Sequence, residues 1–195
     1  MCKNKKRATN PCFARSRRTL YLVSDTKYRH QIQLRYQDLV QDAYYAKRSV
    51  DQMSENKELL NYIYQNSQMG IETLDQLMSI PDDAEFRKLL QSQYNEYKTI
   101  NDDAKSMAHK LGYEGEGLGF FEKMRTELMI DVQTMMDKST SHISEMLMTG
   151  SNMGIINAIK NLKKYQNAHP EIRGLMEKLL QLEENNYQEL KQYLS

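Results

Sequence analysis

The sequence predicts an all-α protein, an antiparallel four-helix bundle made from two repeated helical hairpins. The main observation is an internal repeat: Ser67-Gln68-Met69-Gly70-Ile71 recurs 84 residues later as Ser151-Asn152-Met153-Gly154-Ile155, and Lys88-Leu89-Leu90-Gln91 recurs as Lys178-Leu179-Leu180-Gln181. A second observation is that apolar residues recur at spacings of three and four, the period of an amphipathic helix. Because one hairpin cannot cover its own apolar face, two copies are expected to pack on one core.

The first hairpin is expected over residues 55–111. Its first helix, over 55–79, carries the stripe Leu60, Ile63, Ser67, Gly70, Leu74 and Leu77. Pro81 ends this helix, and Asp82 with Glu85 is expected to form a capping box for the next. The second helix has its own buried stripe, which consists of Phe86, Leu90, Tyr97, Ile100 and Ala104.

A crossover over 112–138 and a second hairpin over 139–195 follow. Glycines between Gly112 and Gly119 mark the start of the crossover. An extra amphipathic helix is expected after them, with the stripe Phe121, Met124, Leu128, Val132 and Met135. The third helix of the bundle should begin near His142, and Pro170 suits the first position of the fourth, which continues to Leu194. Short hairpin loops and one long crossover describe a known bundle topology.

The chain divides by charge into a basic head, 1–52, and a bundle domain, 53–195. The head carries a net charge of +8 and the domain −7. We expect the head to be disordered or to lie upstream of the true start, because Lys47-Arg48-Ser49-Val50 can be encoded by a ribosome-binding sequence and the clear helical repeat begins after Met53. The alternative is a basic tail that contacts an anionic membrane or nucleic acid.

Composition also bounds the compartment and the partners. The acidic charge of 53–195 argues against nucleic acid as the partner of the bundle. Both cysteines, Cys2 and Cys12, lie in the head, so no disulfide can hold the bundle, which favours a reducing, cytoplasmic location. Since every apolar run is too short to span a bilayer, no transmembrane segment is expected.

Two polar residues interrupt the apolar stripes. Gln93 stands between Leu90 and Tyr97, and Glu183 stands at the matching position before Tyr187. A carboxylate on an apolar seam is costly unless it is paired, protonated or bound to a metal. Because each tyrosine lies one turn away, we expect a buried polar network of Gln93, Glu183, Tyr97 and Tyr187.

The repeat also places a glycine inside each first helix. A helical glycine costs about 1 kcal/mol relative to alanine, so the equivalent pair Gly70 and Gly154 needs a reason. Close packing of neighbouring helices is the favoured interpretation. The other is a small cavity at the centre of the bundle.

The segment 139–146 (Ser-Thr-Ser-His-Ile-Ser-Glu-Met) and the repeated Met-Gly-Ile motifs resemble a small uncharacterised ferritin-like family of clostridial-type bacteria. The resemblance covers 53–195, and a similar bundle occurs more distantly in spore coat proteins of the F-like kind. It implies a ferritin-like fold, and a coat- or stress-associated role with spore association as one location.

Ferritin-like metal enzymes place one Glu on each of two helices and Glu-x-x-His on the other two. At the corresponding positions this chain has Gln93-x-x-Glu96 and Glu183-x-x-Asn186, which lack histidine. Iron oxidation and iron storage are therefore disfavoured. The candidates for a divalent metal are Glu183, Glu96, Glu145 and His142. No catalytic or cofactor-binding residue is assigned.

These observations favour a non-enzymatic, ferritin-like bundle that acts as a structural or protein-interaction module. Such a module needs a protein partner or a second copy of itself. The alternative is a divergent metal-binding, ferritin-like oxidoreductase.

Overall fold

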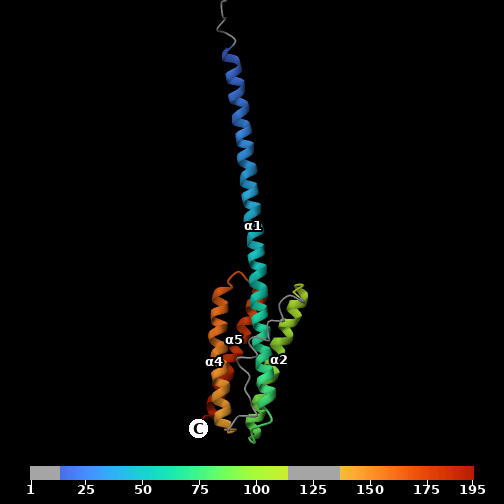
Figure 1. Cartoon of the computed structure of the whole chain (residues 1–195), viewed down its shortest axis with the longest axis vertical. Helices are drawn as coiled ribbons and strands as arrows, with labels where there is room; N and C mark the ends of the chain where they lie inside the picture. Colours follow the sequence, from blue (N-terminus) through green and yellow to red (C-terminus); the bar gives the residue numbers. More distant parts are fainter. Residues whose placement is uncertain (1–13, 114–136) are drawn as a thin grey trace, which may run out of the picture. The chain divides into compact units, whose positions relative to one another are not determined.

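A computed structural model describes residues 14–113 and 137–195, with side chains from residue 29 onward. The described residues form four α-helices and contain no strand, so the all-α class is confirmed (Figure 1). The helices are α1 (Ala14–Leu77), α2 (Ala84–Lys110), α4 (Thr140–Lys164) and α5 (Pro170–Leu190), and a 3₁₀ turn, η1 (Lys191–Tyr193), follows α5. The chain separates into two compact units, one up to Ser49 and one from Val50 onward.

Side-chain caps define where the bundle helices begin. Asp83 caps α2, and its carboxylate accepts hydrogen bonds from the N–H groups of Glu85 at 2.9 Å and Phe86 at 3.1 Å. The expected capping box of Asp82 and Glu85 is therefore wrong by one residue, because Asp83 has the extended backbone that lets one carboxylate reach two N–H groups. Pro170 opens α5 as expected.

The caps of α4 and α5 follow the same physical rule. Ser139 caps α4 and accepts from the N–H of His142 at 3.2 Å. His169 caps α5, where its Nδ1 accepts from the N–H of Glu171 at 3.4 Å. Each bond satisfies an N–H group that has no partner inside its own helix.

Contacts at one end of the bundle fix the directions of its helices. At one end the ring of Phe86, at the start of α2, packs on Tyr193 with centroids 4.7 Å apart. At the same end Ser195 donates its N–H to Ser141, at the start of α4. Since α2 and α4 both begin where the chain ends, they run in the same direction. The end of α2 and the start of α4 therefore lie at opposite ends of the bundle. The extra helix expected around Phe121–Met135 lies outside the described residues.

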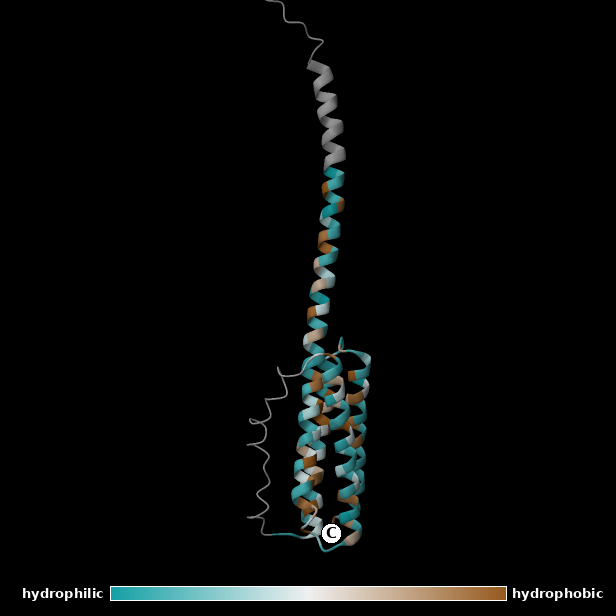
Figure 2. Ribbon diagram, turned by 90° about the vertical axis from the view of Figure 1, so that its right-hand side faces the viewer, coloured by the Kyte–Doolittle hydropathy of each residue, from teal (hydrophilic) through white to brown (hydrophobic). Residues whose placement is uncertain are grey.

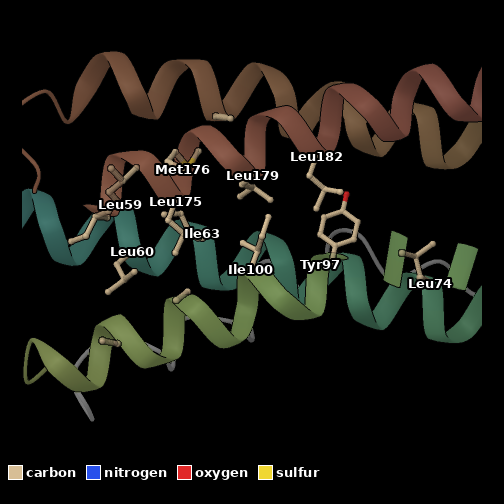
Figure 3. Packing of buried hydrophobic residues seen from close by; sticks show 14 of the residues in the cluster. Leu59, Leu60, Ile63, Leu74, Tyr97, Ile100, Leu175, Met176, Leu179 and Leu182 are labelled. Carbon is tan, nitrogen blue, oxygen red and sulfur yellow. The ribbon is translucent and has the colours of Figure 1, made fainter. Parts of the chain in front are cut away.

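The core lies between α1, α2, α4 and α5, and the expected stripes supply it. Polar and apolar residues alternate along the helices (Figure 2), and the apolar side chains meet inside the bundle (Figure 3). From the α1 and α2 stripes the buried members are Leu60, Ile63, Ser67, Leu74, Leu77, Phe86, Leu90, Tyr97, Ile100 and Ala104. Full burial of one leucine or isoleucine contributes about 1.5–3 kcal/mol. Burial of these apolar side chains is therefore the main stabilising contribution to the bundle unit.

The head differs from the sequence expectation. Helix α1 begins at Ala14, whereas the sequence predicted a helix from about Glu55 and a head that is disordered or lies upstream of the true start. The difference has a local reason, because residues 12–69 contain neither glycine nor proline and are rich in helix formers. All side chains from 29 to 54 are exposed. A translation start at Met53 stays a prediction.

None of the helices in the described part of the chain is long and apolar enough to cross a membrane.

We predict that, at concentrations at which both chains are monomers, a chain beginning at Met53 unfolds with the same midpoint as the full chain. The physical reason is that residues 29–52 bury no side chain, whereas the core begins at Asn56 and Leu59. Circular dichroism melts of both chains, followed at the same molar concentration, give the comparison. A midpoint that drops by several degrees on truncation would show that the head packs on the bundle.

Candidate functional site

A cavity of about 550 Å³ lies inside the bundle unit, with walls from α1, α2, α4 and α5. Both repeat glycines, Gly70 and Gly154, line it. Part of the wall is apolar and includes Met69, Leu74, Met146, Leu147 and Met153. The polar part includes Asn66, Gln93, Tyr97, Ser151, Glu183 and Asn186. Both interpretations of the glycines, close helix packing and a central cavity, are therefore supported. The same two residues allow close approach of neighbouring side chains and border the cavity.

Glu183 is the most deeply buried acidic side chain of the cavity wall, with 3% of its surface exposed. Asn66 of α1 donates its Nδ2–H to Glu183 Oε1 over 2.8 Å. Gly154 of α4 makes room for the carboxyl group, because a Cβ at this position would lie 2.7 Å from Glu183 Cδ and Oε1. The Glu183 carboxyl group on α5 therefore accepts a hydrogen bond from α1 and fills space that a side chain at position 154 of α4 would occupy.

Tyr97 of α2 occupies the matching space beside Gly70. A Cβ on Gly70 would lie 2.8 Å from three atoms of the Tyr97 ring. The phenol is buried, and its hydroxyl interacts with Glu183, Asn186 and Ser151. Each repeat glycine therefore accommodates one large side chain from the second helix of its own hairpin.

Burial changes the ionisation of this cluster. Loss of water raises the pKa of Glu183, and the polar groups of Tyr97, Asn66 and Ser151 oppose that rise. Burial, followed by the negative charge of Glu183, also raises the pKa of Tyr97 and that of the nearby Tyr62. Both phenols therefore remain protonated at neutral pH and can donate hydrogen bonds.

Several buried polar atoms at this site lack a well-formed hydrogen bond within the described residues. They are Glu183 Oε2 and both polar atoms of the Asn186 side chain. Asn186 lies one turn after Glu183 on α5 and is 2% exposed. Buried polar atoms without partners cost about 1–3 kcal/mol each, so the cluster has unused hydrogen-bonding capacity.

The expected network of four residues is only partly assembled. Glu183 and Tyr97 come together, but Gln93 donates to Glu189 Oε2 over 3.4 Å instead. Tyr187 is half-buried, with the Lys191 ammonium 4.9 Å from its ring centroid. The reason is helical phase: the buried stripe of α5 continues from Glu183 to Asn186 and Leu190, which turns Tyr187 to the edge.

Sequence reasoning did not assign Asn66, Ser151 and Asn186 to this network. Asn66 directly precedes the first copy of the repeat, and Ser151 opens the second copy. Asn186 had been seen only as the residue that replaces a histidine ligand. A search for short polar residues on the glycine-bearing faces would have found Asn66 and Ser151.

The four metal candidates do not form one cluster. Glu96 is exposed on α2, where partial burial and the charge of Glu189 raise its pKa. His142 and Glu145 lie in the first turns of α4 and border the cavity that Glu183 also lines. Over residues 29–113 and 137–195, no three His, Cys, Asp or Glu side chains gather closely enough to hold a metal ion.

Comparisons of the chain with models of known protein families, with curated proteins and with solved structures find no match in any of the three.

We predict that Glu183→Gln is at least as stable as the parent chain at neutral pH and less sensitive to pH. Because burial raises the folded-state pKa of Glu183, the folded state holds this proton more tightly than the unfolded state, whose carboxyl has a pKa near 4.5. Stability contributed by this group is therefore present below the unfolded pKa and is lost as the pH rises through the folded pKa. Glutamine keeps an oxygen for Asn66 and carries no charge.

Urea unfolding of both chains between pH 4 and pH 8 measures the difference in the free energy of unfolding, which should grow in favour of the variant as the pH rises. A Glu183→Gln chain that is less stable at every pH would show that the carboxylate has a compensating partner.

We predict that Gly154→Ala is less stable than Gly150→Ala by about 1–3 kcal/mol, the usual cost of overpacking. Both substitutions lie on α4 and bring the same gain in helix propensity. A Cβ at 150 has no neighbour within 4 Å, whereas one at 154 meets the Glu183 carboxyl. Equal stabilities in urea would mean that Glu183 moves aside without cost.

Proposed function

We propose that this chain is a non-enzymatic, ferritin-like helical bundle that acts as a protein-interaction module and associates with a second copy of itself. The observation that supports this proposal is an exposed apolar stripe on α1. Every side chain between 29 and 54 is exposed, including large apolar ones. Tyr36 is 64% exposed, Leu39 67% and Val50 60%. Apolar side chains arranged on one side of a helix usually have a partner.

The stripe has the spacing of a coiled coil. Apolar residues alternate at intervals of four and three over three heptads, at Ile32, Tyr36, Leu39, Ala43, Ala46, Val50 and Met53. In heptad notation these residues fill successive d and a positions. This stripe lies before Met53, where the clear helical repeat of the bundle begins. Apolar residues outside the stripe, such as Leu34 and Tyr44, obscure its period in the sequence.

The charges beside the stripe favour two parallel copies in register. Asp42 occupies a g position and Lys47 the e position of the following heptad. In a parallel dimer these positions face each other across the interface, so Asp42 of one copy meets Lys47 of the second. The small Ala43 and Ala46 at the middle of the stripe permit a close approach of the two helices.

One observation favours the alternative, a divergent metal-binding oxidoreductase. His142, Glu145 and Glu183 border the same cavity, although they do not converge on one point. Metal analysis of protein purified without chelator, together with absorbance after addition of ferrous iron and oxygen, tests this function. Stoichiometric metal and oxygen-dependent absorbance would favour the oxidoreductase over the interaction module.

We predict that the full chain is a dimer in sedimentation velocity and that Leu39→Asp weakens the dimer at least a hundredfold. Two leucines are lost per dimer, each worth about 1.5–3 kcal/mol when buried, and about 1.4 kcal/mol corresponds to a factor of ten. The control is Leu34→Asp, which changes the same residue type on the same helix outside the stripe. It should leave the dimer intact.

A charge swap tests the orientation. Asp42→Lys should weaken the dimer, and adding Lys47→Asp should restore it. A full chain that remains monomeric at all concentrations, or equal effects of Leu39→Asp and Leu34→Asp, would contradict self-association through this stripe.

A further inference from the structure

The cavity of the bundle unit combines a negative charge with an apolar wall. Its acidic side chains are Glu183 and Glu145, and no lysine or arginine from the described residues lines it. At its polar side, Glu183 Oε2 and the Asn186 amide are buried without well-formed hydrogen bonds. The lining also includes three methionines, Met69, Met146 and Met153. The combination calls for a ligand that is cationic at one end and apolar at the other.

We infer that the cavity binds a small primary alkylammonium ion, with its ammonium group at Glu183 and Asn186 and its alkyl chain against the methionines. An ammonium group donates three hydrogen bonds and accepts none. The Glu183 carboxylate and the side-chain oxygen of Asn186 are acceptors with unused capacity. The volume of about 550 Å³ lies in the range of sites for small molecules.

The apolar wall suits an alkyl chain. Methionine side chains are flexible and polarisable, so three of them can adapt to chains of different length. Gly70 and Gly154 leave space beside Tyr97 and Glu183, where any Cβ would collide. The glycines therefore let the Tyr97 ring and the Glu183 carboxyl group pack at the wall of the cavity, where the ammonium end would bind.

Other ligand classes fit the same residues less well. A carboxylate or phosphate would be repelled by Glu183 and Glu145 and would meet His142 but no lysine or arginine among the described residues of the wall. A bare metal ion requires several ligands that converge, and the described residues offer no group of three. A neutral alcohol leaves the buried carboxylate without a countercharge, which an ammonium supplies.

The experiment uses the full chain and three probes of equal length: n-hexylammonium, n-hexanol and hexanoate. Isothermal titration calorimetry should give saturable binding of hexylammonium, at least tenfold weaker binding of hexanol and none of hexanoate.

The location of the bound hexylammonium is measured by NMR of methionine methyl groups labelled with carbon-13. The resonances of Met69, Met146 and Met153 should shift, while those of the core residues Met148 and Met176 should move little.

A matched pair of variants separates the site from a general charge effect. Glu183→Gln should weaken hexylammonium binding at least tenfold. Glu184→Gln, which removes the same charge from the exposed neighbouring residue on α5, should leave binding unchanged. Circular dichroism of Glu183→Gln confirms that the variant is folded, so a loss of binding reports the carboxylate.

Three outcomes would overturn the inference. Equal affinity for hexylammonium and hexanol would make the cavity a purely apolar one. Equal losses in Glu183→Gln and Glu184→Gln would show attraction by net charge alone. Absence of saturable binding of hexylammonium to the full chain would show that the cavity takes no such ligand.

Discussion

The burial of the Glu183 carboxyl group is the constraint on which the centre of this bundle depends. A carboxyl group removed from water must be protonated, paired or well supplied with hydrogen bonds. The chain supplies one hydrogen bond from Asn66, nearby polar groups from Tyr97 and Ser151, and space beside Gly154. Together with Glu183 itself, these residues come from all four helices. Burial of the Glu183 carboxyl group therefore restricts which residues each of the four helices can carry beside it.

The two glycines show how the two hairpins solve a similar packing problem with different chemistry. Gly70 accommodates the phenol of Tyr97, and Gly154 accommodates the carboxyl of Glu183. The two hairpins therefore differ at this level, since the first places a phenol beside its glycine and the second a carboxyl group. The cavity between the helices is lined by both polar groups and methionines.

Gln93 is followed three residues later by Glu96, and Glu183 by Asn186, so neither position has the histidine of a Glu-x-x-His motif. Glu183 is followed by Asn186, whose amide is a hydrogen-bonding group and a poor partner for a bridged pair of metal ions. Tyr97 and Tyr62 keep their protons, because burial raises the pKa of both phenols. The centre is therefore rich in hydrogen-bonding groups. These properties suit hydrogen-bonded packing and recognition of a polar group.

The exposed apolar stripe of α1, Ile32 to Met53, obeys a different constraint from the bundle core. Its apolar side chains are exposed, whereas those after Asn56 are buried by other helices of the same chain. An isolated helix of this composition gains little from its own hydrogen bonds, since most helical stability comes from packing. A partner helix would supply that packing. The heptad spacing from Ile32 to Met53 describes the kind of helix that would fit.

The amino-acid pattern by itself determined the all-α class, the buried stripes of α1 and α2, the start of α5 at Pro170 and the burial of Glu183. These features follow from the spacing of apolar residues along the chain and from the chemistry of neighbouring residues, both of which the sequence contains. The pattern misplaced the cap of α2 by one residue and missed the exposed heptads, because neighbouring aspartates and scattered apolar residues blur local signals.

Only the tertiary structure decided that Asn66, Ser151 and Asn186 surround Glu183 while Gln93 and Tyr187 do not. Those contacts depend on the rotation of each helix about its axis. That rotation is set by the packing of four helices together.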